Sequence, residues 1–331
     1  MSRIARSLAA LTATLALSLP AHAAGSLTRT FVSSAGVDSN PCTITAPCAS
    51  FAAAYAAVQV NGIVAALDPG KYGPLTITTG VTINGNGWSA ITAPASGTGI
   101  TINASTANVA LIGLEIDGAG AGYNGIMVNS AGGLTVTNCT LQNFVINGSD
   151  TTTGNGILMQ PSSGTLNFTI TGTTASNNNY AGVYYFPAGG SPNANGVIDH
   201  VMANADTNGI IINTANTSGG TTVVAVSNSI ASNNSSGGVV DQNSASSTIK
   251  MSVDNVTASG NVVGVNANGI NAGGASASML LGRSVIVGNS DYGVLNTTTP
   301  STLYTYQDNR INLNGIADIQ GTPLNTTFPK Q

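Results

Sequence analysis

The sequence predicts an all-β solenoid of about ten turns, in which short strands stack along one axis. A degenerate ten-residue segment, best seen as LTVTNCTLQN at residues 134–143, returns about every 27 residues to the end of the chain. Between its copies, a Gly followed by Ile or Val recurs with gaps of 22 to 31 residues. Such a period is typical of repeat proteins whose units cannot bury a face alone. The later copies are 168–177, 195–204, 224–233, 251–260 and 280–289, and the Gly positions are Gly125, Gly156, Gly182, Gly209, Gly238, Gly264, Gly293 and Gly315.

The chain has few charged residues and a net negative charge, and these two features exclude some classes of function. Only 6% of residues are charged, against roughly 25% in an ordinary domain. Apolar and polar residues nevertheless alternate in nearly every segment, which a disordered chain lacks. Without the predicted signal peptide, six of the eight Lys and Arg remain against 12 Asp and Glu, a net charge of −6. This acidic balance argues against nucleic-acid binding, which needs basic clusters.

The N-terminus has the pattern of a secretory signal peptide over residues 1–23. Arg3 and Arg6 precede an apolar run at 8–19, and a small-residue cleavage site ends at Ala23. No stretch is apolar over the length that a transmembrane helix needs. The sequence therefore predicts a secreted or periplasmic protein with one domain over 24–321 and a C-terminal tail, 322–331, that is loose or partly covers the last turn.

The three cysteines have two expected roles. Cys42 and Cys48 enclose a short loop that ends at Pro47, and export to an oxidising compartment favours a disulfide between them. Two free thiols are the alternative. Cys139 lies inside a repeat copy, where we expect a packed thiol.

A helix over about 50–59 is expected to cap the first turn. Phe51, Tyr55 and Val58 share one helical face, and Ser50 is a suitable N-cap. A solenoid needs its first turn shielded from water and from pairing with other strands.

The opening of the repeat region resembles the first coil of right-handed parallel β-helix proteins of the pectin lyase-like superfamily. The resemblance implies a solenoid of stacked parallel strands, and the later repeats extend it over nearly all of the chain after residue 23. It implies no one chemistry, because the superfamily holds lyases, hydrolases, esterases and non-catalytic adhesins. The residues that carry it are Leu67, Pro69, Gly70, Tyr72, Leu75, Ile77, Ile83 and Gly85.

Asn is expected at the turn after the first strand of each copy, because it tolerates a left-handed backbone and its amides can stack. Asn138, Asn228 and Asn255 hold this position, and the alignment of copies places Asp199 and Ser284 there too.

An apolar stripe is expected on the outside of the strands that follow the Gly positions. It offers a hydrophobic groove for a polymer or partner protein, with Tyr184 as the sugar-stacking ring. Loops that cover the stripe are the alternative. The stripe consists of Met127, Leu158, Tyr184, Ile211, Val240, Asn266 and Leu295.

The repeat copies predict a second set of outward positions. Threonines occupy these positions in the first two copies, and other residues occupy them in the later copies. Asp254 and Arg283 fall one turn apart in this set, where we expect an exposed ion pair. The expected outward pairs are Thr135 and Thr137, Thr169 and Thr171, Gly196 and Ile198, Ala225 and Ser227, Ser252 and Asp254, and Leu281 and Arg283.

The segment Val197-Ile198-Asp199-His200 resembles the Ile-Asp-His segment of pectate lyases. That resemblance implies that Asp199 is a calcium ligand, with Asp206 as a possible second. Val197 stands where the family has an aromatic residue, and the chain lacks the family's Arg-x-Pro-x-x-Arg base segment. The alternative is that Asp199 is a turn residue and that His200 has no catalytic role.

Function is therefore expected to be non-catalytic binding of a polysaccharide or another cell-surface component. The first alternative is a polysaccharide lyase or hydrolase with a diverged site at Asp199, His200 and Asp241, with calcium as a possible cofactor. Asp241 is included because an unpaired carboxylate at an inward position is costly, so it either points outward or marks a site. The second alternative is a structural protein of an envelope or matrix.

Overall fold

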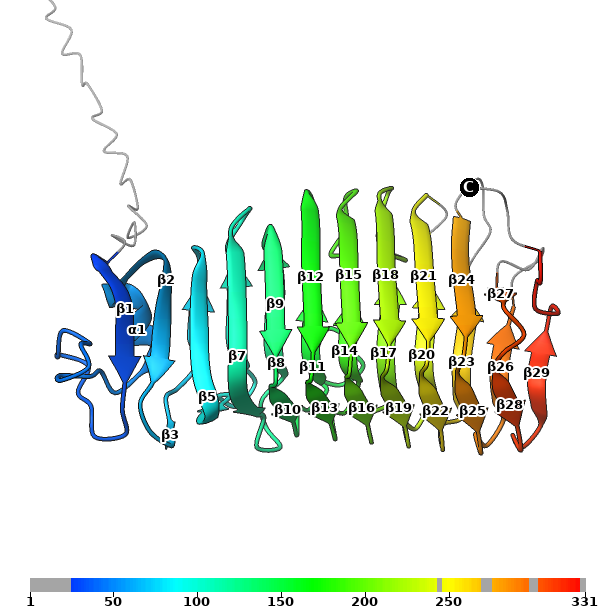
Figure 1. Ribbon diagram of the computed structural model, residues 1–331, viewed down its shortest axis with the longest axis horizontal. Helices are drawn as coiled ribbons and strands as arrows, with labels where there is room; N and C mark the ends of the chain where they lie inside the picture. Colours follow the sequence, from blue (N-terminus) through cyan, green and yellow to red (C-terminus); the bar gives the residue numbers. More distant parts are fainter. Residues whose placement is uncertain (1–24, 243–245, 269–275, 298–302, 328–331) are drawn as a thin grey trace, which may run out of the picture.

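The computed structural model describes residues 25–242, 246–268, 276–297 and 303–327, and within them the chain is a rod-shaped parallel β-helix (Figure 1). Every pairing between its named strands is parallel, as in β12 with β15 and β14 with β17. The predicted signal peptide, 1–23, and residues 328–331 of the predicted tail lie outside the described residues. None of the described helices has the length and hydropathy that crossing a membrane requires.

Each turn of the rod contributes strands to two sheets. The 19-stranded sheet contains one series of strands that are longer in all turns but the last, and one series of strands of two or three residues. The longer strands are β1 (Leu27–Val32), β2 (Val58–Ala66), β5 (Val81–Thr92), β7 (Asn108–Asp117), β9 (Gly133–Thr137), β12 (Thr165–Thr171), β15 (Asn193–Asp199), β18 (Thr221–Ser227), β21 (Thr248–Asp254), β24 (Ser276–Gly282) and β27 (Leu303–Thr305). The short strands are β3 (Gly70–Lys71), β10 (Thr140–Gln142), β13 (Thr174–Ser176), β16 (Met202–Asn204), β19 (Ile230–Ser232), β22 (Thr257–Ser259), β25 (Val285–Val287) and β28 (Arg310–Asn312).

The second sheet has ten strands, and it places one strand in each turn. The expected all-β fold of about ten turns is thus confirmed. The strands are β4 (Leu75–Ile77), β6 (Thr98–Asn103), β8 (Asn124–Ser130), β11 (Asn155–Met159), β14 (Ala181–Tyr185), β17 (Asn208–Asn213), β20 (Gly237–Gln242), β23 (Val263–Asn268), β26 (Tyr292–Asn296) and β29 (Ala317–Gly321).

The core is built from columns of apolar side chains, one from each turn. Because strand side chains alternate between faces, stacking in register places like residues on top of one another. Fully burying one such side chain contributes about 1.5 to 3 kcal/mol. One column, with every member 1% exposed or less, consists of Leu111, Val136, Ile170, Ile198, Val226, Val253 and Leu281.

The recurring Gly positions lie where neighbouring turns approach most closely. A Cβ atom at Gly209 would come within 2.7 Å of the Gly238 carbonyl oxygen and 3.0 Å of Asn234 Nδ2. Gly182 and Gly238 meet the equivalent carbonyl of the next turn in the same way. The Gly repeat therefore reflects the lack of space for any side chain.

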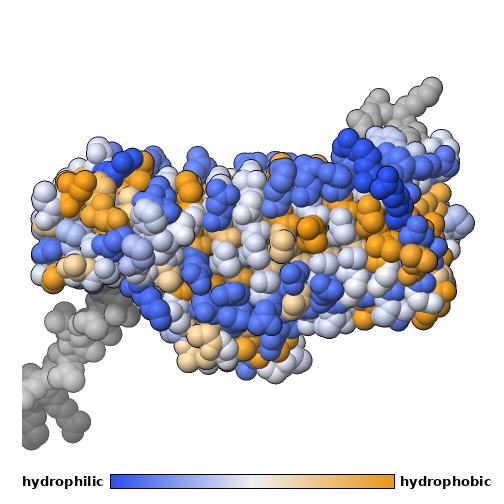
Figure 2. Space-filling model, turned by 60° about the horizontal axis from the view of Figure 1, so that its bottom comes forward, coloured by the Kyte–Doolittle hydropathy of each residue, from blue (hydrophilic) through white to orange (hydrophobic). Residues whose placement is uncertain are grey.

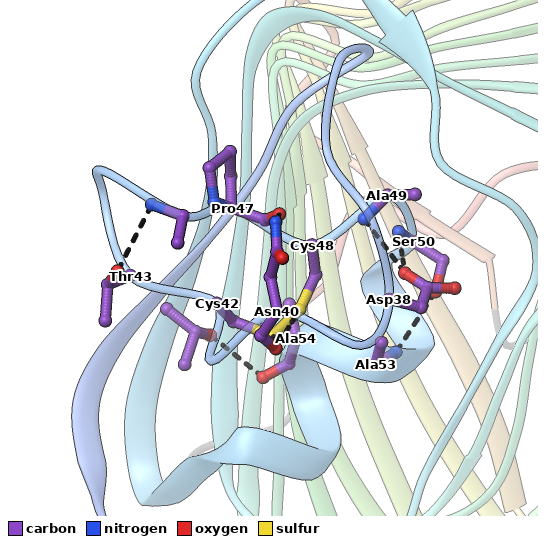
Figure 3. Close-up of a disulfide and its surroundings, with 12 residues drawn as sticks. Asp38, Asn40, Cys42, Thr43, Pro47, Cys48, Ala49, Ser50, Ala53 and Ala54 are labelled. Atoms are coloured by element: carbon purple, nitrogen blue, oxygen red, sulfur yellow. Dashed lines mark hydrogen bonds between the residues drawn. A yellow bond between two sulfur atoms is a disulfide. The ribbon is translucent and has the colours of Figure 1, made fainter.

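The N-terminal end is closed by α1 (Phe51–Ala57), which confirms the predicted cap within two residues (Figure 1). Ser50 is its N-cap, and the Ser50 hydroxyl accepts a hydrogen bond from the Ala53 N–H at 3.2 Å. Phe51 and Tyr55 are buried against the first turn. The predicted Cys42–Cys48 disulfide is present beside the helix (Figure 3).

The C-terminal end is less well covered. Asn325 pairs with β27, where the Thr305 N–H donates to the Asn325 carbonyl and the Asn325 N–H to the Leu303 carbonyl. Leu313 and Ile316 remain 82% and 64% exposed. Hydrophobic residues accordingly gather at this end of the rod (Figure 2).

Candidate functional site

The outward face of the longer strands carries a continuous column of uncharged side chains, one from each of nine turns. We call it the outer column. Two hollows, of 690 Å³ and 380 Å³, follow each other along it and together include all nine members. The members, in stacking order, are Thr82, Ala110, Thr135, Thr169, Val197, Ala225, Ser252, Leu280 and Tyr304.

The first hollow is lined by amides and hydroxyls. Asn108, Asn167 and Asn195 stand exposed along one border, and Asn195 Nδ2 donates to Asn167 Oδ1 at 3.0 Å. Thr135 and Thr169 form part of its floor. The lining contains no charged side chain.

The second hollow is more apolar. Val223 stands 41% exposed at its border, and Leu280 and Tyr304 belong to its lining. Lys250 is the charged side chain of this lining, and it is exposed.

Strand register corrects two of the predicted outward pairs. Thr169 and Thr171 stack on Val197 and Asp199, so Gly196 and Ile198 point inward. Further along, Ser252 and Asp254 stack on Leu280 and Gly282, so Leu281 points inward. Both errors are slips of one residue in the alignment of degenerate copies. The observed register places Val197 in the outer column with Asp199 beside it, and it places Leu280 in the column in the later turn.

Asp199 lies on the outward face at the end of β15, beside the outer column. Its Oδ1 accepts hydrogen bonds from Ser227 Oγ at 2.7 Å and Asn228 Nδ2 at 2.8 Å, and its Oδ2 lies 2.6 Å from His200 Nδ1. These contacts, that of Ser227 first, lower the pKa of Asp199 to about 2. Asp199 is therefore an ionised carboxylate with its oxygens engaged.

His200, and not Asp199, occupies the left-handed turn position. Its φ is 51°, alongside 53° at Asn138 and 47° at Asn228. Arg283, at 49°, holds this position in a later turn where the sequence placed Ser284. The side chain of His200 is 66% exposed.

Asp206 lies inside the coil, in a ladder of buried amides that the sequence analysis missed. Asp206 Oδ1 accepts the Asn178 N–H at 2.7 Å, and Asn234 Oδ1 accepts the Asp206 N–H at 3.0 Å. The recurrence of Asn every 25 to 28 residues was the available signal for the later members. The ladder consists of the buried Asn178, Asp206, Asn234, Asn261 and Asn289 and the half-buried Asn314.

The second carboxyl oxygen of Asp206 takes the place of an amide nitrogen. A Cβ atom on Gly182 would lie 2.8 Å from Asp206 Oδ2, and a Cβ atom on Gly209 would lie 3.0 Å from Asn234 Nδ2. The two side-chain atoms therefore occupy equivalent places in neighbouring turns. Asn234 Nδ2 donates to Asn261 Oδ1 at 2.9 Å, whereas Asp206 Oδ2 has no hydrogen-bond partner. Burial raises the pKa of Asp206 to about 8.

Asp241 also points inward, in β20 of the ten-stranded sheet, and is 1% exposed. Its Oδ1 accepts the Asn268 N–H at 2.9 Å, and burial raises its pKa to about 7. Asp206 and Asp241 thus face the interior while Asp199 faces outward. The structure does not bring these three carboxyls together, and the described residues contain no group of three or more His, Cys, Asp or Glu able to hold a metal ion.

Tyr184 stacks in register with Leu158 and Ile211, as the predicted stripe requires, but all three are buried. Its ring stacks on Phe186 at 4.9 Å between centroids and lies 5.3 Å from the ring of Tyr180. A sugar cannot reach this ring, so Tyr184 is not part of the candidate site. Its burial follows from the aromatic residues flanking β14, which cover the centre of the stripe.

Two further predictions concern local contacts. Arg283 forms the expected ion pair with Asp254, and Arg283 Nε donates to Asp254 Oδ1 at 2.9 Å. This contact, together with the attraction of the guanidinium, lowers the pKa of Asp254. Cys139 is buried, and burial raises the pKa of its thiol to about 11, as expected for a packed residue.

Among solved structures, the chain is similar to pectate lyase Pel9A, with 16% sequence identity and a TM-score of 0.48 over 89% of this chain and 79% of that chain. Comparisons with protein-family models and with curated proteins find no match. The strand pairing itself establishes the parallel stacking of the turns. The chain is a parallel β-helix protein.

Proposed function

We propose that this protein binds an extended polysaccharide along the outer column and does not cleave it. The observation that carries the proposal is the pair of consecutive hollows over nine turns in register. A linear polymer fits such a site, because successive turns repeat at ~4.8 Å and offer similar contacts to successive sugar residues. The Cys42–Cys48 disulfide is compatible with a site outside the cytoplasm.

The carboxylates beside the outer column support binding over hydrolysis. Asp199 and Asp254 stack on either side of Ser227, two turns and therefore ~10 Å apart. A glycosidase acid needs a raised pKa so that it holds a proton to donate. Both of these carboxyls have lowered pKa values. The carboxyls with raised pKa values, Asp206 and Asp241, face the interior.

The test is affinity electrophoresis in gels that contain single polysaccharides, combined with assays for reducing ends and for unsaturated products. Retardation without product formation is the expected result. Failure of every polysaccharide to retard the protein, with no product formed, would contradict the proposal and favour the structural envelope or matrix protein.

A lyase or hydrolase remains the second candidate function, and the contact between Asp199 and His200 at the edge of the outer column favours it. In that case product forms from a polysaccharide, and Asp199→Ala abolishes it while retardation persists. Addition and chelation of calcium in the same assay test whether the reaction needs that ion.

A further inference from the structure

The charge around the outer column indicates which polysaccharides it can take. The first hollow has no charged side chain in its lining, and Lys250 is the single charge of the second. A site for an acidic polymer needs cations spaced along it, because each buried or half-buried anion must be compensated. One exposed Lys, in the seventh of the nine turns of the column, does not supply that.

Apart from Lys250, the charged side chains beside the outer column on the same face of the strands that the structure describes are the carboxylates of Asp199 and Asp254. Asp199 lies two residues after Val197 of the column, and Asp254 lies two residues after Ser252. The lowered pKa of Asp199 keeps it ionised at neutral pH. Arg283 is already engaged by Asp254. An acidic polymer in the hollows would therefore lie beside negative charge, which repels its carboxylates.

The uncharged groups present suit sugar hydroxyls. The amides of Asn108, Asn167 and Asn195 each carry both donor and acceptor atoms, and the hydroxyls of Thr135 and Thr169 do the same. Hydroxyl groups of sugars need this mixture, whereas a carboxylate needs donors alone. Further along, the exposed Val223 and the lining residue Leu280 offer apolar surface to the C–H faces of sugar rings.

We infer that the ligand of the outer column is an uncharged polysaccharide, such as a neutral glucan, xylan or mannan, and not a polyuronate. The inference rests on the proposed function and adds the chemical class of the ligand. It departs from the acidic polymer that the sequence resemblance around Asp199 suggests.

The test compares retardation of the full chain by neutral polysaccharides (a β-glucan, a xylan and a mannan) and by polygalacturonate and alginate. Each gel is run with and without calcium, and at about 0.01 M and about 1 M salt, between which the screening length falls from ~30 Å to ~3 Å. Lys250→Ala is the matched variant, because it removes the one cation of the lining. We expect at least one neutral polysaccharide to bind, with less than about a twofold change between the two salt concentrations.

Three outcomes go against this expectation in different ways. Binding of polyuronates alone, weakened by salt or by Lys250→Ala or dependent on calcium, overturns the inference but leaves the proposed function intact. Equal binding of both classes also overturns it, because Asp199 should disfavour the acidic polymers. Binding of no polysaccharide overturns the proposed function itself. Circular dichroism of Lys250→Ala checks that a changed result does not come from misfolding.

Discussion

Asp206 has a carboxyl group in an environment that disfavours its ionised form. It sits in the ladder of buried amides, where its Oδ2 lacks the partner that Asn234 Nδ2 has in the next turn. With a pKa of about 8 in the folded state, it is neutral at pH 7. In the unfolded chain an Asp ionises near pH 3.9. The fold therefore loses stability as pH rises from about 4 to about 8, because the unfolded chain releases this proton first.

Asp206→Asn should remove that penalty. The Asn amide can donate as its ladder neighbours do, so the variant is expected to equal the parent near pH 4 and to be more stable by on the order of 5 kcal/mol at pH 8. Urea unfolding at pH 4, 6 and 8 measures the difference. A difference that does not grow with pH would show that Asp206 is not held neutral by burial. Asp241, with its pKa raised to about 7, titrates in both proteins and cancels in the comparison.

The orientation of individual side chains was also the feature that the sequence predicted least well. The turns of the copies at 195–204 and 280–289 lack the Asn that marks this position in Asn138, Asn228 and Asn255, so the sequence repeat predicts a register one residue away from the observed one. His200 and Arg283 adopt the left-handed backbone there instead. A one-residue slip in a strand exchanges its inward and outward faces. The outward pairs at Val197 and Asp199 and at Leu280 and Gly282 were lost for this reason.

Among the structural elements, the stacked Gly positions have the least tolerance for change. Gly209→Ala should destabilise the protein by about 1 to 3 kcal/mol, because its Cβ meets the Gly238 carbonyl and the Asn234 amide. Gly219→Ala is the control, since its nearest neighbour, at 2.9 Å, is the rotatable hydroxyl of Ser191. Its effect is expected to stay within about 0.5 kcal/mol. Thermal melting of both variants tests this, and equal losses would argue against close stacking.

The helical cap gives a second prediction at this scale. Ser50→Ala removes both the acceptor for the Ala53 N–H and the hydroxyl that donates to Asp38 Oδ2 at 2.9 Å. A loss of about 1 kcal/mol is expected. Ser50→Thr keeps the capping oxygen and serves as the control. Hydrogen exchange over 51–57 is the measurement, and unchanged protection in Ser50→Ala would mean that the cap does not depend on this side chain.

The helix, the disulfide and the Gly repeat could be predicted from sequence because each depends on local residue types. The burial of Tyr184 could not, because it depends on how residues outside the strand, Tyr180 and Phe186, fold back over it. Likewise, Asp206 has no sequence neighbour that reveals its place in the ladder. Its partners lie 28 residues away on either side.

At the scale of the whole molecule, the rod owes its shape to nearest-neighbour contacts, so that each turn interacts mainly with the turns beside it. The repeat made this architecture predictable. The hollows were not predictable, because they depend on the relative size of side chains in adjacent turns. The same stacking brings distant residues such as Thr82 and Tyr304 onto one face.

The most direct test compares two substitutions in the same turn. Thr169 and Thr174 are both half-buried, outward-facing threonines on strands, but only Thr169 lines a hollow of the outer column. Titration calorimetry of Thr169→Arg and Thr174→Arg with a neutral polysaccharide that the parent binds gives the two Kd values. We predict that Thr169→Arg raises Kd at least about tenfold, a loss of about 1.4 kcal/mol, while Thr174→Arg changes it less than about twofold. Equal effects, or a larger effect of Thr174→Arg, would contradict it.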